Sequence, residues 1–284
     1  MTAAIEATGL TKDYGSGRGI FDLDLAVEPG TVFGFLGPNG AGKTTTIRLL
    51  MGLIHPTRGS ARVFGLDCDR DAVEVKRRVG YVPGELPQWG GLRGSEIVAY
   101  LAGPRGAIDE RWTGELVDRF GLDLGRTYRE YSHGNKQKLA VVIAFLHRPE
   151  LAILDEPTTG LDPLNQQAFY ALIREQRAAG ATLFLSSHVL AEVEQVCDRV
   201  GIVREGRLAA VGTLAELGQL HASHVEVEFG EPVPRELLAA IPGLSDLAVD
   251  GHVARFALQG PFDALVAALA GRHVQRVISR EPTL

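Results

Sequence analysis

Residues 37–44 read GPNGAGKT and fit the pattern G-x-x-x-x-G-K-[ST]. An apolar run typical of a β-strand, 31–36, comes directly before them, and a stretch that favours a helix, 45–50, follows. The glycines let successive backbone N–H groups point inward, and such a nest at the positive end of a helix binds anions. The Lys43 ammonium can then reach the β- and γ-phosphates of a nucleotide, and the Thr44 hydroxyl can bind Mg²⁺. The segment therefore predicts a phosphate-binding loop rather than an ordinary glycine-rich turn.

Two adjacent carboxylates form the second candidate. Asp155 and Glu156 follow the apolar run 151–154, and ligands of open α/β sheets bind at the carboxyl ends of strands. Asp155 can hold the Mg²⁺ shell, and Glu156 can orient and deprotonate an attacking water. An acidic turn after a core strand is the alternative, but the preceding phosphate-binding loop favours the functional interpretation.

His188 is the third candidate, because it lies between the expected strand 181–186 and the helix that follows. An imidazole at the end of a strand can donate to a γ-phosphate and respond to its loss. A lone histidine in this position is more often a polar cap. Its function therefore depends on the residues near it.

These residues need a scaffold, and β-type runs alternate with helical patterns up to about residue 220, as in an α/β fold with a largely parallel sheet. The expected strands are 31–36, 79–82, 151–154, 181–186, 199–203 and 208–211. The expected helices are 44–51, 71–78, 94–101, 110–120, 134–146, 164–179, 189–196 and 213–220. Residues 84–148 contain several helices and no convincing strand, so we expect a helical subdomain inserted into the sheet domain.

The last part of the chain has a different pattern. Residues 221–224 are typical of a linker, and apolar and acidic residues then alternate from Val225 to Phe229, as in a half-buried strand. Helix 234–240, strands 246–249 and 253–258, helix 261–270 and strand 274–279 are expected to follow. This βαββαβ order is typical of a small ferredoxin-like module. We expect a domain over 1–220 and an accessory or contact domain over 221–284.

Composition limits the class of protein. A chain of 284 residues with 45% apolar and 23% charged residues fits one large globular domain and a small one. The net charge of −6 argues against broad binding to nucleic acid. Cys68 and Cys197 have no metal-like or redox spacing, which favours a reducing compartment. No apolar run approaches the roughly 20 residues that span a bilayer, and the N-terminus lacks signal-peptide features. We expect a soluble cytoplasmic polypeptide.

Together the motifs resemble those of the ATP-binding-cassette (ABC) ATPases. The segments that carry the resemblance are GPNGAGKT at 37–44, YSHGN at 131–135, LAILDEP at 151–157, TTGLD at 158–162 and SSHV at 186–189. The likeness covers residues 4–220 and implies a P-loop NTPase core of the ABC type. By this resemblance, 37–44 is the Walker A loop. The residues implied in binding the phosphates are Gly37, Pro38, Asn39, Gly40, Ala41, Gly42, Lys43, Thr44 and Thr45.

The resemblance also implies roles for residues outside that loop. Asp155 is the Walker B aspartate, Glu156 the catalytic glutamate, and His188 the switch histidine. The set of catalytic residues is then Glu156, His188 and Lys43, and the Mg²⁺ ligands are Thr44 and Asp155. Three further residues belong to nucleotide-contacting motifs: Ser132 and Gly134 of the signature and Asp162 of the D-loop. Tyr14 matches the aromatic residue that stacks on adenine; its alternative is an ordinary strand-edge tyrosine.

Two segments depart from the family pattern. Tyr81-Val82-Pro83 leads to Gly84 where the family has its lid glutamine, so no amide is available there to touch Mg²⁺. Glu85 or Gln88 substitutes for it, or the lid acts through its backbone. We expect a Gly84→Gln change to alter basal ATPase activity modestly, because Mg²⁺ tolerates several waters. The signature has His133 and Asn135 in place of a glycine and a glutamine, and we expect phosphate binding to survive this.

The function that this resemblance implies is ATP hydrolysis by a subunit that drives export of a drug, antibiotic, lipid or polymer. Its partners would be integral membrane permease subunits, touched near residues 84–102, and a second copy of the chain in a homodimer with two equivalent ATP sites. Its cofactors would be ATP and Mg²⁺, and it would lie at the inner face of the cell membrane. The alternatives are a soluble ABC-type ATPase acting on nucleic acid or the ribosome, and a nucleotide-binding regulator with little turnover.

Overall fold

The computed structural model describes residues 2–103, 109–220, 223–232 and 235–280. The chain divides into two compact units, Met1–Val211 and Gly212–Leu284, which are described separately. The division falls before the helix α8 (Leu214–Leu220) rather than after it, so this helix belongs to the second unit.

A six-stranded sheet forms the centre of the first unit, with the strand order β10-β9-β3-β8-β7-β6. Its strands are β3 (Val32–Leu36), β6 (Val79–Val82), β7 (Leu151–Asp155), β8 (Thr182–Ser187), β9 (Arg199–Arg204) and β10 (Arg207–Gly212). The pairs from β6 through β7, β8 and β3 to β9 are parallel, which confirms the expected α/β class. Every residue of β3, β7 and β8 is buried, as is usual for parallel strands covered on both faces.

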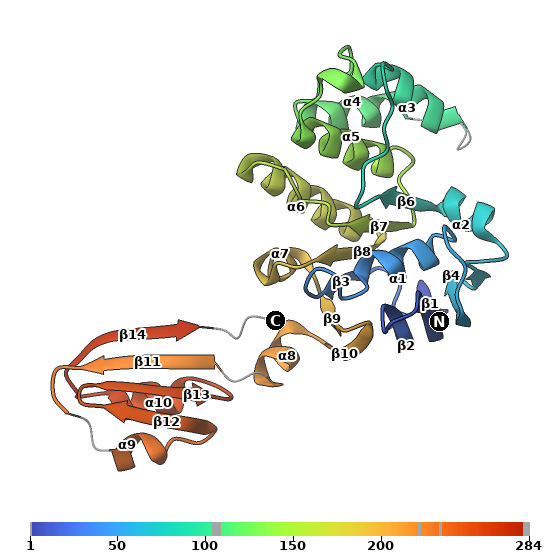
Figure 1. Ribbon diagram of the computed structural model, residues 1–284. Helices are drawn as coiled ribbons and strands as arrows, with labels where there is room; N and C mark the ends of the chain where they lie inside the picture. The colour runs from blue at the N-terminus through green and yellow to red at the C-terminus, as the bar shows by residue number, and fades with distance from the viewer. Residues whose placement is uncertain (1, 104–108, 221–222, 233–234, 281–284) are drawn as a thin grey trace. The chain divides into compact units, whose positions relative to one another are not determined.

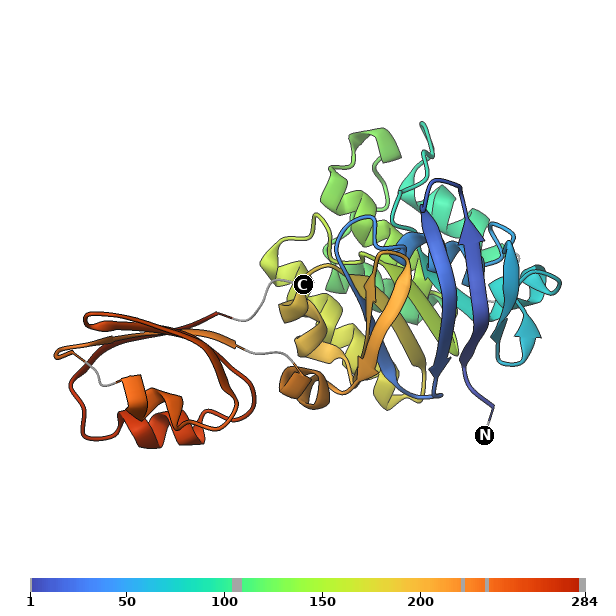
Figure 2. The ribbon, with the colours of Figure 1, turned by 60° about the horizontal axis from the view of Figure 1, so that its bottom comes forward.

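A second sheet of the first unit is antiparallel, with the order β2-β1-β4-β5 (Figure 2). It consists of β1 (Ile5–Asp13), β2 (Gly19–Val27), β4 (Arg58–Val63) and β5 (Leu66–Asp67). These strands were not among those expected from the sequence. Their signal is the alternation of buried and exposed residues in β2, where Leu23, Leu25 and Val27 face the core. The helix α1 (Lys43–Leu50) contacts both β7 and the strands β2 and β4, so it lies between the two sheets.

Helices fill the chain between β6 and β7, as predicted for residues 84–148. They are α3 (Gly94–Ala102), α4 (Glu110–Arg119) and α5 (His133–Phe145), with a 3₁₀ turn at Tyr128–Glu130 (Figure 1). Trp112 of α4 is 1% exposed, and its ring N–H donates to the Phe145 carbonyl of α5 over 2.8 Å. The remaining helices of this unit are α2 (Ala72–Arg78), α6 (Pro163–Ala178) and α7 (Leu190–Val196). Of these, α6 contacts β8 and α7 contacts β3.

The second unit has its own sheet and core. Its elements are β11 (Ser223–Phe229), α9 (Arg235–Ala239), β12 (Leu244–Asp250), β13 (Val253–Leu258), α10 (Asp263–Leu269) and β14 (Val274–Arg280). The strand order is β12-β13-β11-β14 with antiparallel neighbours, which confirms the predicted βαββαβ module. Both helices lie on one face of the sheet (Figure 2). The expected linker 221–224 is partly wrong, because Ser223 and His224 pair with β13 as the start of β11, while 221–222 lie outside the described residues.

Both cysteines are free thiols. Cys68 is 2% exposed, and burial raises the pKa of its thiol to about 12. Cys197 is half-buried at the end of α7, and burial raises its pKa further above the ordinary value. Within the described ranges, no helix combines the length and the apolar character that crossing a bilayer requires.

Candidate functional site

The predicted phosphate-binding loop connects β3 to α1, and Gly42 is the N-cap of that helix with φ 108°. No side chain caps the helix, so the N–H groups of its first turn, Lys43 to Thr45, have no acceptor within the helix. Gly37 and Gly42 are both needed sterically. A Cβ on Gly37 would lie 2.3 Å from the Val203 carbonyl oxygen, and one on Gly42 would lie 2.6 Å from Ile20 Cγ2. The loop therefore offers free amide donors at the positive end of a helix.

Lys43 lies inside this loop and is 5% exposed. Its Nζ donates to the carbonyl oxygens of Gly37 over 2.6 Å and Pro38 over 3.2 Å. It also forms an ion pair of 3.2 Å with Oε1 of Glu156. The side chain thus joins the phosphate-binding loop to the end of β7, so two of the predicted catalytic residues are in contact.

The other residues predicted in the loop lie around that lysine. Pro38, Asn39 and Gly40 are exposed, and Thr44 and Thr45 are half-buried. Ala41 is 3% exposed, and its carbonyl oxygen accepts from the Gly206 N–H over 3.0 Å. The exposed edge of the loop is therefore the part that a phosphate can approach.

Asp155 is the last residue of β7 and is fully buried. Its Oδ1 accepts from the Ser186 hydroxyl over 2.6 Å, while its buried Oδ2 has no hydrogen-bond partner among the residues that the structure describes. A buried carboxylate oxygen without a partner is costly and calls for an explanation. A Mg²⁺ ion or its water shell would supply one, because Mg²⁺ takes oxygen ligands. The arrangement fits the predicted metal-binding role of Asp155.

Glu156 begins the loop after β7 in a strained conformation, with φ 49°. Such left-handed backbone costs roughly 1–3 kcal/mol in a residue other than glycine and is common at functional sites. Its backbone N–H donates to the Ser186 hydroxyl over 3.0 Å. Its Oε2 lies 2.8 Å from Nδ1 of His188, and its Oε1 contacts Lys43. The structure therefore brings all three predicted catalytic side chains together, although they come from three separate segments.

The signature residues lie at the start of α5. Ser132 is the N-cap, and its Oγ accepts from the Asn135 N–H over 3.2 Å. A Cβ on Gly134 would lie 2.7 Å from the Gly160 carbonyl oxygen, so this turn packs closely against segment 158–162. Asp162 is the N-cap of α6, with its Oδ1 accepting from the Asn165 N–H over 3.0 Å.

No hydrogen bond or ion pair of the described residues joins Ser132, Gly134 or Asp162 to the phosphate-binding loop.

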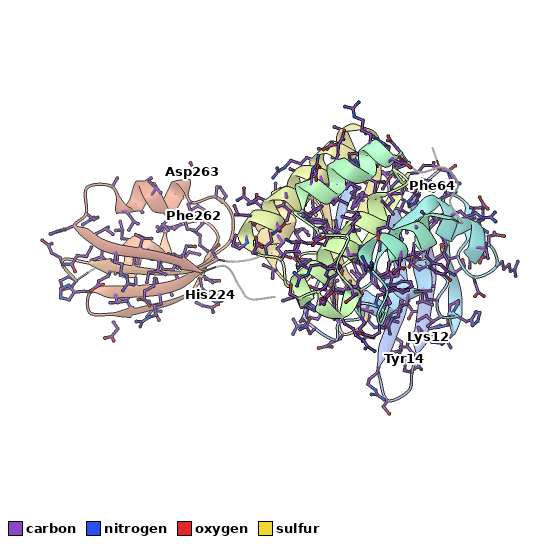
Figure 3. The ribbon with its side chains drawn as sticks, turned by 90° about the horizontal axis from the view of Figure 1, so that it is seen from above. Lys12, Tyr14, Phe64, His224, Phe262 and Asp263 are labelled. Atoms are coloured by element: carbon purple, nitrogen blue, oxygen red, sulfur yellow. The ribbon has the colours of Figure 1, made fainter. Side chains whose placement is uncertain are left out.

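Tyr14 lies in the turn between β1 and β2, and its side chain is 50% exposed. The Lys12 ammonium lies 5.5 Å from the centre of its ring, and Figure 3 shows the two side chains close together near the end of the hairpin. The other end of the same turn contacts the loop, since a Cβ on Gly42 would lie 3.4 Å from the Gly19 carbonyl oxygen. The start of β2 thus lies next to the phosphate-binding loop, and the turn before it leaves an aromatic ring accessible.

The segment after β6 borders a cavity of about 430 Å³. Thr44 and Arg48 of α1, Gly84, Glu85 and Trp89 are among the residues that line it. Gly84 lies against Asp155, because a Cβ on it would be 2.6 Å from Oδ2. Glu85 forms an ion pair of 3.3 Å with Arg48 and its side chain is 88% exposed, and Gln88 is also exposed.

Sequence reasoning missed two side chains that hold the site in place. Ser186 bonds to both Asp155 and the Glu156 backbone, and Gln137 of α5 donates to the Pro157 carbonyl oxygen over 2.9 Å. Ser186 could have been found from its place two residues before His188 at the end of an apolar strand. Gln137 gives no such signal, because it is an ordinary helix residue whose partner is 20 positions away.

Comparison with known proteins adds an independent finding. The family model described as "ABC transporter" matches residues 20–159. The bacitracin transport ATP-binding protein BcrA of Bacillus licheniformis is 38% identical over 239 residues, which are 81% of this chain and 76% of that protein. The chain belongs to the ABC transporter family. ABC ATP-binding proteins bind and hydrolyse ATP, so the expected ATPase activity is confirmed at the level of the family.

Other ABC relatives extend the match. The daunorubicin/doxorubicin resistance ATP-binding protein DrrA of Streptomyces peucetius is 39% identical over 229 residues, 79% of this chain and 69% of that protein. The Nod factor export ATP-binding protein I of Cupriavidus pinatubonensis is 33% identical over 291 residues, 100% of this chain and 89% of that protein. A solved ATP-binding subunit of an ABC transporter has a TM-score of 0.72 at 34% identity, covering 76% of this chain and 92% of that one. The P-loop NTPase fold of the ABC type is thereby confirmed.

Proposed function

We propose that this chain hydrolyses ATP to drive export of a drug, antibiotic, lipid or polymer through a separate membrane permease. The observation that carries the catalytic part is the position of Glu156, held between Lys43 at 3.2 Å and His188 at 2.8 Å next to the buried Asp155. The relatives named above are ATP-binding proteins of bacitracin transport, daunorubicin resistance and Nod factor export. They support an exporter and give no support to an ATPase acting on nucleic acid.

Each residue of the site has a distinct role in this proposal. The free amides of the loop and the Lys43 ammonium bind the phosphates, and the Thr44 hydroxyl and Asp155 Oδ2 are the groups that would hold Mg²⁺. A Mg²⁺ ion held by these two residues would supply positive charge against the charge that develops on the phosphate oxygens. Glu156 accepts the proton of the attacking water, and His188 holds the carboxylate in place through its Nδ1.

Two copies of the chain complete the site in our proposal. Within the described residues, Ser132, Gly134 and Asp162 form no hydrogen bond or ion pair with the phosphate-binding loop of their own chain, so we assign them to the nucleotide of a second copy. The first turn of α5 would then present the Ser132 hydroxyl and backbone N–H groups to phosphate. Tyr14, with its exposed ring, would stack on adenine.

The permease would contact the cavity after β6. Trp89 and Tyr100 form an edge-to-face pair with ring centres 6.1 Å apart, and Tyr100 is 68% exposed. Exposed aromatic side chains of this kind are common anchors in protein interfaces. In this proposal the chain lies on the cytoplasmic side of the membrane and is held there by the permease. The second unit, which folds around its own core, is assigned an accessory role.

The test is the change Glu156→Gln in the purified chain. Nucleotide binding should be retained, while hydrolysis should slow by roughly 10²- to 10⁴-fold, the usual contribution of a positioned general base. This corresponds to about 3–5 kcal/mol of activation free energy. With turnover blocked, ATP and Mg²⁺ should shift the chain to a dimer in size-exclusion chromatography.

Glu194→Gln is the matched control, because Glu194 is an exposed residue of α7 outside the site. It should behave as the wild type. Near-normal turnover of Glu156→Gln, with only monomer in the presence of ATP and Mg²⁺, would refute the assignment. The export function is tested separately, by identifying the membrane protein that co-purifies with the chain.

A further inference from the structure

Glu192, in the first turn of α7, holds two segments of the catalytic site through one carboxylate. Its Oε1 accepts from the Thr158 hydroxyl over 2.7 Å, and its Oε2 accepts from the Ser187 hydroxyl over 2.6 Å. Thr158 is 4% exposed and Ser187 is 1% exposed, so both hydroxyl groups are shielded from water. The two bonds are short, as expected for hydroxyl donors to a charged carboxylate.

The two hydroxyl groups belong to the segments that carry the catalytic pair. Thr158 is two residues after Glu156, and the intervening turn closes with a bond of 3.2 Å from the Thr159 N–H to the Glu156 carbonyl oxygen. Ser187 directly precedes His188, and its Oγ also accepts from the Val189 N–H over 3.0 Å. The Ser187 hydroxyl, which binds Glu192, therefore belongs to the residue before His188 and also bonds to the backbone of the residue after it.

Glu156 needs such support because its backbone is strained, with φ 49°. Ser186 supports its N–H from one side, and Gln137 bonds to the next carbonyl oxygen, that of Pro157. Neither of these two side chains forms a described bond to Ser187 or His188. Glu156 and His188 are 2.8 Å apart and belong to two different segments. Among the described side chains, Glu192 bonds to one residue of each segment, with one carboxylate oxygen to Thr158 and the other to Ser187.

We propose that Glu192 is a positioning residue that fixes the distance between Glu156 and His188. It touches neither the nucleotide site nor the reacting atoms, and acts through Thr158 and Ser187. The inference rests on the proposed roles of Glu156 and His188. The competing explanation is that Glu192 only stabilises α7, since an acidic residue in the first turn favours the helix.

The test compares Glu192→Ala with wild type in the purified full-length chain. Losing both bonds should let the two segments separate, and a displacement of the order of 1 Å in a catalytic group costs up to about 100-fold in rate. We expect kcat to fall by about 10- to 100-fold, with KM for ATP within about threefold of the wild type. Glu194→Ala, two positions further along the same helix and exposed, is the control and should match the wild type.

The decisive measurement is the double variant with His188→Ala. If Glu192 acts through the catalytic pair, the change Glu192→Ala should cost little further kcat once His188 is absent. A residue that only stabilises α7 would instead lower the melting temperature and leave kcat of the folded protein unchanged. Losses in kcat that multiply fully in the double variant would overturn the proposal.

Two smaller changes cover the case in which Glu192→Ala does not fold. Thr158→Val and Ser187→Ala each remove one donor, and each should reduce kcat in the same direction; unchanged kcat in both would overturn the proposal. Glu156→Gln is measured in parallel. If Glu156→Gln turns over normally, the proposed function of Glu156 has failed. If it is inactive while Glu192→Ala, Thr158→Val and Ser187→Ala are all normal, only the role of Glu192 has failed.

Discussion

Adding a side chain at position 84 should weaken the binding of nucleotide with Mg²⁺. A Cβ on Gly84 would lie 2.6 Å from Oδ2 and 3.0 Å from Cγ of Asp155. These distances are well inside the ordinary contact separation of about 3.5–4.0 Å between carbon atoms. Asp155 cannot turn away freely, because it is fully buried and its Oδ1 is bonded to Ser186 at 2.6 Å. Either the carboxylate leaves its position or the segment after β6 moves outward.

The size of the effect follows from this collision. Forcing an extra methyl group into a packed site typically costs about 1–3 kcal/mol. Because about 1.4 kcal/mol corresponds to a tenfold change in affinity, Gly84→Ala should weaken Mg²⁺-dependent nucleotide binding by about 5- to 100-fold. Gly84→Gln should be no better, since its Cβ meets the same carboxylate before its amide can reach the metal. The expectation from sequence was a modest change in basal ATPase activity for Gly84→Gln, whereas the short distance to Asp155 predicts a marked loss of nucleotide affinity.

The assay is displacement of a fluorescent nucleotide from the purified chain, once with Mg²⁺ and once with a chelator. Affinity in the chelator should stay close to wild type in both variants, because the loop amides and Lys43 are untouched. Gly91→Ala is the matched control, since a Cβ there meets no atom within 4 Å. If Gly84→Ala binds as tightly as wild type in Mg²⁺, or if Gly84→Gln binds more tightly, the reasoning from Asp155 is wrong.

Four further changes test other parts of the structure. Lys43→Ala removes the buried cation of the loop and should abolish both ATP binding, measured by calorimetry, and hydrolysis. Glu85→Ala breaks an exposed ion pair, so thermal melting and basal ATPase activity should be unchanged. In the reconstituted permease complex it should lower transport per ATP, and unchanged transport would make Glu85 an ordinary surface charge. The hydrogen bond from the Asn165 N–H lowers the pKa of the Asp162 carboxyl in the folded protein. The ionised carboxylate therefore stabilises the fold at pH values above the pKa of the unfolded chain, and this stability is lost as the pH falls through the lower pKa of the folded protein. Asp162→Ala should therefore lower the melting temperature at neutral pH but not in strong acid. Trp112→Phe removes a buried bond to Phe145 and should lower the free energy of unfolding by about 1–3 kcal/mol in urea titrations.

The parts of the site that could be predicted are the motifs that lie within one short segment of the sequence. The spacing of glycines and lysine in 37–44 and the acidic pair after 151–154 are each contained in one short segment. Their chemistry depends on a strand end or a helix start, and both features leave a periodic signal. The βαββαβ module was predictable for the same reason, because each of its elements has its own apolar pattern.

The parts that were missed depend on contacts between distant segments. Strands β1, β2 and β4 pair, together with β5, within their own antiparallel sheet, and register shifts interrupt the pairing of β1. Gly84 approaches Asp155 closely although the two are more than 30 residues apart in the sequence. The bond between Thr158 and Glu192 also joins positions more than 30 residues apart, whereas Ser187 is near Glu192 in the sequence. Such pairs exist only once the strands of the sheet have been placed side by side.

The raised pKa values of its two thiols make the natural chain suitable for site-specific chemical labelling. Only the thiolate reacts readily with maleimides or forms disulfides, and burial raises the pKa of Cys68 to about 12 and that of Cys197 above its ordinary value. In the folded protein, a cysteine introduced at an open position should therefore react far faster than either natural one. Leu164, 82% exposed beside Asp162, is such a position. Oxidative cross-linking there would report the approach of two copies without first removing the natural cysteines.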